Sequence, residues 1–140
     1  MLNPHALNPR IEKGAPVIVQ GITGRQGQRH ARLMRAYGTN VVGGVSPKSS
    51  TEMVDDMPVF KTCADAVAAT GAVATVVLVR PDLAADAIIE AAQAGISTVV
   101  CVAEGIPVHD ALRAYRVTRD LGTFWVGAST PGMAIPSIGL

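Results

Sequence analysis

The fold follows from one stretch, Pro16-Val17-Ile18-Val19-Gln20-Gly21-Ile22-Thr23-Gly24-Arg25-Gln26-Gly27. Its first part, residues 16–20, is an apolar run, and the β-branched residues in it favour a buried strand. Its second part carries glycine at every third position from Gly21 to Gly27 and opens a helical pattern. Together the two parts predict a strand, a tight turn and a helix, as in the units that build an α/β fold.

The same alternation of apolar runs and helical patterns continues along the chain. Strands are expected at residues 17–20, 41–45, 73–79, 98–103 and 123–126, with a short extra strand at Pro58-Val59-Phe60. Helices are expected at 26–37, 63–70, 83–94 and 107–121, the last with Val108, Leu112, Tyr115 and Leu121 broadly on one face, and a polar loop at 46–57. Strands that alternate with helices pair in parallel through right-handed crossovers. The expected architecture is therefore α/β, an open parallel sheet with helices on both faces.

Composition restricts the class of protein. The 140 residues, 49% of them hydrophobic, are expected to form one domain at 16–130, with an N-terminal extension at 1–15 and a tail or truncated linker at 131–140. The net charge of +1 argues against nucleic acid binding through a broad basic field. No run of the roughly 20 apolar residues that cross a membrane and no secretory leader is visible. With Cys63 and Cys101 expected as reduced thiols, the expected location is cytoplasmic.

The turn at Gly21–Gly27 has the composition of an anion-binding loop. The first turn of a helix has unpaired N–H donors and a positive dipole end, and glycine lets a phosphate approach without an obstructing Cβ. The spacing is G-x-x-G-x-x-G rather than G-x-G-x-x-G, and the lysine and hydroxyl residue of a P-loop are missing. We therefore expect a cofactor with phosphates. A purely structural turn, in which Gly27 allows close packing, is the alternative.

Three cations are expected at the edge of the sheet where ligands bind. Ligands of open α/β sheets lie beyond the carboxyl ends of the strands. Arg25, Lys48 and Arg80 each follow a predicted strand at that edge. Their gathering in a nearly neutral chain favours a polyanionic ligand.

The end of the second predicted strand argues against plain NAD. Folds that bind NAD place an Asp or Glu there, about 20 residues after the glycine motif, to hold the ribose 2′-hydroxyl. Here the sequence reads Gly43-Gly44-Val45-Ser46-Pro47-Lys48 and has no carboxylate. Small residues followed by hydroxyls and a lysine suit a phosphorylated ribose, either the 3′-phosphate of coenzyme A or the 2′-phosphate of NADP. A solvated loop lysine is the alternative for Lys48.

Several short motifs then complete a familiar pattern. After Gly21–Gly27 come Tyr37-Gly38-Thr39, Val42-Gly43-Gly44-Val45, Pro58-Val59-Phe60, Ala66-Val67-Ala68-Ala69-Thr70-Gly71-Ala72 and Glu104-Gly105-Ile106-Pro107. In this order and spacing, over residues 12–133, the chain strongly resembles the N-terminal coenzyme A-binding domain of the succinyl-CoA synthetase (succinate–CoA ligase) α subunit. The resemblance implies a Rossmann-like fold, coenzyme A as the cofactor, and a place among the ligases of the tricarboxylic acid cycle.

The resemblance also implies which residues bind the cofactor. They follow three strands: Thr23, Gly24, Arg25 and Gln26 at the phosphates, Lys48 and Ser49 after the second strand, and Val102, Ala103 and Glu104 further along the edge. The family has a lysine where this chain has Ser49. Lys48, one position earlier, is expected to take the role of that lysine.

The chain departs from the family pattern at particular positions. Arg25 stands where the family has a small hydroxyl residue. The family's G-P-N-C/T-P-G loop is here Gly127-Ala128-Ser129-Thr130-Pro131-Gly132, which alters the loop expected near the thiol end. The family's phosphorylated histidine lies in a second domain, and none of His5, His30 and His109 matches it.

No catalytic residue and no metal ligand are expected within the chain. The spacing of His30 places it on the helix face of Gly27, which predicts a packed histidine rather than a catalyst. Cys63 stands near a helix start, where a thiol could have a lowered pKa, but its sequence context assigns it no role.

These observations predict a coenzyme A-binding domain or subunit of a succinyl-CoA synthetase-like, nucleoside diphosphate-forming acyl-CoA ligase. It would hold coenzyme A through the glycine-rich loop, lack the phosphohistidine domain, and work with an ATP-grasp β-type subunit or a separate phosphohistidine domain. Two alternatives stay open at this point. One is a regulatory or carrier module that responds to coenzyme A without catalysis, and the other is an NADP-binding oxidoreductase domain.

Overall fold

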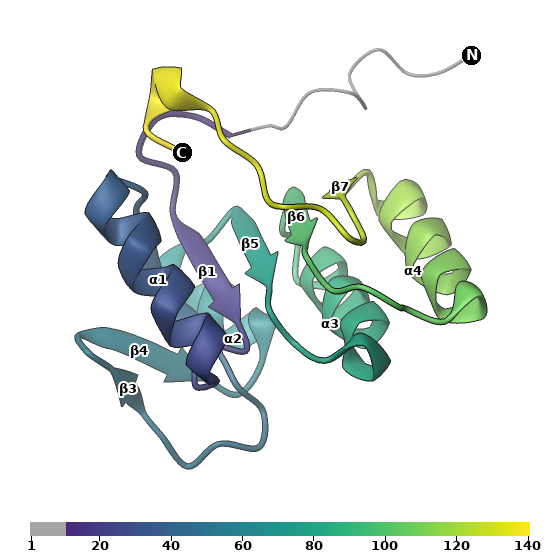
Figure 1. Ribbon diagram of the computed structural model, residues 1–140, viewed down its shortest axis with the longest axis horizontal. Helices are drawn as coiled ribbons and strands as arrows, with labels where there is room; N and C mark the ends of the chain where they lie inside the picture. The colour runs from purple at the N-terminus through teal and green to yellow at the C-terminus, as the bar shows by residue number, and fades with distance from the viewer. Residues whose placement is uncertain (1–10) are drawn as a thin grey trace.

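A single seven-stranded sheet organises the chain, in the order β3-β4-β2-β1-β5-β6-β7 (Figure 1). The computed structural model describes residues 11–140, so residues 1–10 of the expected extension, with His5, lie outside the described part. The strands are β1 (Val17–Gln20), β2 (Val41–Val45), β3 (Met53–Val54), β4 (Met57–Phe60), β5 (Ala74–Val77), β6 (Thr98–Cys101) and β7 (Phe124–Val126). The helices are α1 (Arg25–Tyr37), α2 (Cys63–Thr70), α3 (Pro81–Gln93) and α4 (Val108–Leu121), followed by a 3₁₀ turn, η2 (Pro136–Ile138).

Parallel pairing dominates the sheet. Every neighbouring pair of strands is parallel except β3 and β4, which form an antiparallel hairpin at one edge. The α/β class and the open, Rossmann-like parallel sheet are therefore confirmed.

Helices cover both faces of this sheet. In Figure 1, α1 lies in front of β1, and α2 and α3 lie behind the sheet. α3 packs against both α2 and α4. An apolar cluster that includes Val19, Ile22 and Ala31 lies under α1, and a larger cluster that includes Ile18 and Ile88 lies under α2 and α3. Successive strand residues point to opposite faces, so the buried run of β1 contributes to both clusters.

Two glycines allow close packing around the turn that connects β1 to α1. A Cβ on Gly27 would lie 2.0 Å from the carbonyl oxygen of Gly21, and a Cβ on Gly44 would lie 2.4 Å from the Cβ of Ile22. The structural explanation of Gly27 is thus correct for that residue. Gly24 is different, because it is exposed and a Cβ there would meet only the Gly21 carbonyl oxygen, at 3.3 Å.

The hairpin of β3 and β4 is the main departure from the predicted elements. The expected loop at 46–57 is interrupted, because Met53 and Val54 pair with Pro58 and Met57. A strand of two residues is too short to produce a recognisable alternation of apolar and polar positions. Elsewhere the predictions hold well. The expected strands at 17–20 and 41–45 and the expected helix at 63–70 end where the structure ends them.

The apolar residues of α4 are largely exposed. Ala114 and Thr118 are the buried residues of this helix. The apolar residues that the sequence places broadly on one face of α4 are exposed: Val108, Leu112, Tyr115 and Leu121.

Residues 131–140 return across the sheet toward the carboxyl end of α1 (Figure 1). There, Thr39 Oγ1 donates to the carbonyl oxygen of Gly139 over 3.3 Å. The domain boundary expected before this segment stays a prediction. Across the range 11–140, no helix has the length and apolar character needed to cross a membrane.

Candidate functional site

The glycine-rich turn connects β1 to α1 at the carboxyl edge of the sheet. The N–H of Gly21 donates to the carbonyl of Val45 over 2.8 Å, and the N–H of Gly24 donates to the carbonyl of Gly21 over 3.1 Å. Gly21 has φ of +86°, a left-handed conformation that favours glycine. Gly24 is the N-cap of α1 and has an extended backbone. Backbone hydrogen bonds therefore hold the turn in place, and the N-terminus of α1 lies at the carboxyl edge of the sheet.

The first turn of α1 is open to an anion. No side chain caps it, and its first turn contains no acidic residue. Within residues 11–140, the N–H groups of Arg25, Gln26 and Gly27 have no hydrogen-bond acceptor. Unpaired donors and the positive end of the helix dipole favour a negatively charged ligand at this position.

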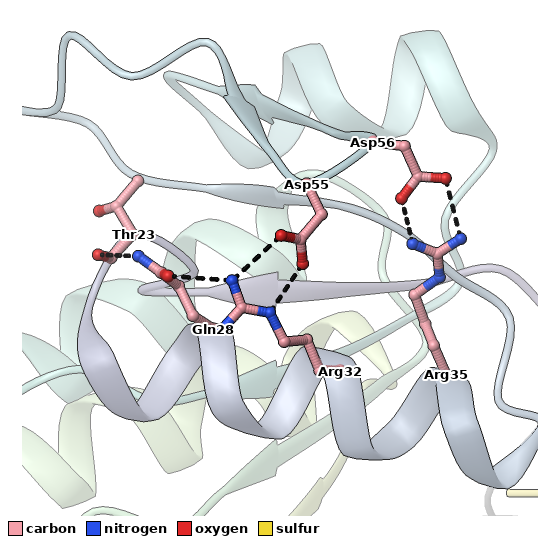
Figure 2. Close-up of polar contacts among 6 residues, drawn as sticks. All are labelled: Thr23, Gln28, Arg32, Arg35, Asp55 and Asp56. Carbon is pink, nitrogen blue, oxygen red and sulfur yellow. Dashed lines mark hydrogen bonds and ion pairs between the residues drawn. The ribbon is translucent and has the colours of Figure 1, made fainter.

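Polar contacts hold the turn against its neighbours. The hydroxyls of Thr23 and Ser46 lie 2.7 Å apart, which connects the turn to the end of β2. Figure 2 shows Gln28 donating from Nε2 to the carbonyl oxygen of Thr23, over 3.0 Å. Arg25 and Gln26 are exposed and stand at the opening of the turn.

The loop after β2 is a second part of the site. The N–H of Ser46 donates to the carbonyl of Phe60 over 2.9 Å, and the N–H of Ser49 donates to the carbonyl of Ser46 over 3.3 Å. Ser49 Oγ accepts the N–H of Thr51 over 3.0 Å. Lys48 is exposed on this loop. The loop is thus a compact turn that carries a cation.

A cavity of about 300 Å³ lies between the two parts. Its lining combines the strand ends, the loop and one side of α3: Gln20, Gly21, Val45, Ser46, Pro47, Lys48, Val79, Leu83, Asp86, Ala87 and Glu90. Gln20 is held in place, since its Nε2 donates to the carbonyl of Ala87 over 2.8 Å and its Oε1 accepts the hydroxyl of Thr75 over 3.1 Å. Val79 and Leu83 offer an apolar surface beside these polar groups.

A larger groove of about 570 Å³ lies elsewhere, between α1 and residues 131–134. Its floor is apolar and includes Val76 and Val100, and His30 is its one basic side chain among the described residues. An anionic ligand gains little from such a lining. The smaller cavity adjoins Lys48 and the turn, and its lining also includes two carboxylates, those of Asp86 and Glu90.

The structure separates Val102, Ala103 and Glu104 from this cavity. They follow β6, and β5 lies between β6 and β1. Val102 lines the larger groove instead. Ala103 is buried, and its carbonyl accepts the N–H of Ser129 over 3.0 Å, while Glu104 is exposed. Their part in cofactor binding stays a prediction for a ligand long enough to extend along the edge.

The set of cations at the edge differs from the predicted one. Arg80 forms an ion pair with Asp82 through hydrogen bonds of 3.0 and 2.8 Å, so its charge is largely compensated. Sequence reasoning missed Lys61, whose Nζ donates to the carbonyl oxygen of Ser49. Lys61 directly follows Phe60, the last residue of β4, so the rule that collects residues after each strand could have found it.

One further expectation is wrong. His30 is exposed at the groove rather than packed, because the buried face of α1 passes through Gly27 and Ala31, and His30 lies beside that face. Burial, and then the charge of Glu90, raises the pKa of Cys63 to about 12, so the lowered pKa that a helix start could give a thiol does not occur here. Burial also raises the pKa of Cys101. Neither thiol is an activated nucleophile.

Comparison with known proteins identifies the family. A family model described as "CoA binding domain" matches residues 12–105, which include the turn, the loop after β2 and the cavity. The chain belongs to the CoA binding domain family. Its most informative relatives are α subunits of acid–CoA ligases, as the resemblance of the sequence implies.

Two relatives and one solved structure define the similarity. The chain is 44% identical over 126 residues to succinate–CoA ligase [ADP-forming] subunit alpha-2 of Trichomonas vaginalis, covering 90% of this chain and 40% of that protein. It is also 44% identical over 130 residues to the malate–CoA ligase subunit alpha of Methylorubrum extorquens, covering 90% of this chain and 44% of that protein. The fold matches a dinucleotide-forming acetyl-coenzyme A synthetase 1 of Ca. Korarchaeum cryptofilum, with a TM-score of 0.80, 16% identity, and coverage of 94% of this chain and 30% of that one. The chain thus spans less than half the length of each of these proteins.

Proposed function

We propose that residues 16–130 bind coenzyme A for an acid–CoA ligase of the succinate–CoA ligase type that forms a nucleoside diphosphate. The supporting observation is the open first turn of α1, which lies within the segment matched by the CoA binding domain model. Its N–H donors and the exposed Arg25 and Gln26 suit the pyrophosphate, with Thr23 and Gly24 forming the turn.

The cavity beside this turn suits the adenosine part of the ligand. Its wall of Val79 and Leu83 offers apolar contact to a planar base. Lys48 and Ser49, in the loop after β2, would bind a phosphate on the ribose. The pantetheine arm would then extend along the edge toward Val102, Ala103 and Glu104.

In this proposal the chain binds coenzyme A and presents its thiol, and the acyl phosphate is formed on another domain or subunit. The thiol of bound coenzyme A would attack an acyl phosphate delivered by an ATP-grasp β-type subunit and a phosphohistidine domain. No residue between 16 and 130 is assigned a catalytic role. The two relatives are named for different acids, succinate and malate, so we propose an acid–CoA ligase without naming its acid substrate.

The test is calorimetric titration of the chain with coenzyme A, dephospho-coenzyme A and NADP in parallel. Binding of coenzyme A that weakens without the 3′-phosphate supports the proposal. Binding of NADP with no response to coenzyme A would contradict it and favour an oxidoreductase domain, whose 2′-phosphate the same loop would suit. Addition of a candidate β-type subunit then tests whether thioester formation needs both chains.

A further inference from the structure

Lys61 stands beside the loop that follows β2, although it belongs to a different strand. β2 and β4 run in parallel, and Val45 at the end of β2 pairs with Phe60 at the end of β4. The N–H of Ser46 continues this ladder by donating to the carbonyl of Phe60 over 2.9 Å. The residue after Phe60 is therefore brought to the start of the loop by backbone pairing, independently of its side chain.

The side chain of Lys61 reaches into this loop. Its Nζ donates to the carbonyl oxygen of Ser49, the residue that follows Lys48. An ammonium group has three donors, so this contact leaves two of them for a ligand. Within residues 11–140, neither Lys48 nor Lys61 forms an ion pair with a carboxylate. Two uncompensated positive charges thus accompany one short loop.

Ser49 adds a neutral donor to the two cations. Its Oγ accepts the N–H of Thr51 over 3.0 Å, which leaves the hydroxyl hydrogen available for another acceptor. Charged donors and a hydroxyl together match the oxygens of a phosphate monoester, which carries up to two negative charges at neutral pH. Lys48 also lines the cavity of about 300 Å³, so such a phosphate would lie at the cavity mouth.

We infer that Lys61 is a further binding residue of this site and that, together with Lys48, it binds the 3′-phosphate on the ribose of coenzyme A. The contact with Ser49 also positions the loop for this phosphate. The inference rests on the proposed function, because it names the residues that recognise one group of the proposed ligand. It explains why a lysine follows β4 at a place where the sheet alone requires none.

The test compares the affinity for coenzyme A with that for dephospho-coenzyme A in matched lysine variants. Lys61→Met should weaken the binding of coenzyme A about tenfold or more and change that of dephospho-coenzyme A less than about twofold, because a hydrogen bond to a charged group is lost only with the former. Lys61→Arg should restore most of the affinity. Lys13→Met is the control, since Lys13 is exposed and precedes β1 at the opposite edge of the sheet. It should leave both affinities unchanged.

Each other outcome overturns the inference in a recognisable way. Equal losses for the two ligands in a folded Lys61→Met variant would mean that Lys61 only supports the loop. A loss of affinity for NADP, with coenzyme A unaffected, would mean that the lysines recognise a 2′-phosphate. If the unmodified chain binds no coenzyme A, the proposed function itself fails, and this result is distinct from a failure of Lys61 alone. Far-UV circular dichroism of every variant confirms that the fold is retained.

Discussion

Gly27 lies so close to Gly21 that a Cβ on Gly27 would stand 2.0 Å from the Gly21 carbonyl oxygen. The atoms that it would meet belong to the backbone of the turn, which cannot move aside as a side chain can. We therefore expect Gly27→Ala to destabilise the fold by about 3 kcal/mol, at the upper end of what overpacking costs, or to prevent folding. Urea-induced unfolding followed by circular dichroism measures this loss.

Gly24→Ala is the matched control for that substitution. Gly24 has φ of −73°, which any residue adopts, and its Cβ would be 3.3 Å from the nearest atom outside its immediate neighbours. We expect a change of no more than about 1 kcal/mol, the usual size of an N-cap effect. A loss as large as that of Gly27→Ala would contradict the packing difference between the two glycines.

A larger residue at Gly24 tests whether the turn binds the phosphates. Valine fits the extended backbone of Gly24, so Gly24→Val should retain the fold. Its branched side chain would stand where a phosphate approaches the α1 N–H groups. The affinity for coenzyme A should therefore fall at least about tenfold, with Gly24→Ala in between. Calorimetric titration measures this series. A folded valine variant with undiminished affinity would exclude the turn as the phosphate site.

The main elements of the fold could be predicted because their signals are local. β1 and β2 are buried from both faces, so their sequences are continuous apolar runs, and α1 ends at Gly38, whose φ of +115° suits glycine. The hairpin strand β3 could not be predicted in this way. Its pairing depends on β4 and on the burial of Val54 under α1, which is tertiary information.

The candidate site could be predicted only as far as strand order determines it. The turn after β1 and the loop after β2 meet at one edge because parallel strands end together. Which partner each cationic side chain contacts could not be predicted from the sequence. Arg80 is compensated by Asp82, whereas Lys61 reaches Ser49, and both depend on side-chain positions across the fold. The exposure of the apolar face of α4 could not be predicted for the same reason, since the periodicity of the sequence identifies an apolar face but not what it packs against.

Cys63 provides a test of burial through alkaline stability. Its pKa is raised from the ordinary value of 9.0 to about 12 by burial. Between these values the unfolded chain releases the thiol proton and the folded chain retains it. The contribution of the Cys63 thiol to the free energy of unfolding is therefore fully present below about pH 9. It is lost as the pH rises toward 12, by up to about 1.4 kcal/mol per pH unit. Urea unfolding at increasing pH, for the unmodified chain and for Cys63→Ala, measures this part of the slope.

The expected result is a shallower alkaline loss of stability in Cys63→Ala than in the unmodified chain. Cys101 and the other titrating groups are common to both proteins, so the difference isolates Cys63. Thiol labelling should agree, with Cys63 unreactive in the native state and reactive on unfolding. Parallel slopes, together with rapid native labelling of Cys63, would show that the thiol is accessible and titrates normally.

Asp55 and Asp56 connect the β3–β4 hairpin to α1 through Arg32 and Arg35 (Figure 2). The guanidinium of Arg32 donates to both carboxylate oxygens of Asp55, over 2.8 and 3.0 Å, and this hydrogen bonding lowers the pKa of Asp55. Asn suits the positive φ of Asp55, so Asp55→Asn removes the charge without straining the turn. Because the pair is exposed, we expect a small decrease in melting temperature at neutral pH.

The dependence on pH and salt decides whether this decrease comes from the ion pair. A carboxylate with a lowered pKa stabilises the fold above its ordinary value of 3.8, and this contribution is lost as the pH falls through the lowered value. The melting temperatures of Asp55→Asn and the unmodified chain should therefore converge in strong acid, and also in about 1 M salt, which screens exposed charges. Glu52→Gln, at an exposed acid outside the ion pairs of residues 11–140, is the control. A difference that persists under both conditions would mean that the substitution acts through the conformation of the hairpin turn instead.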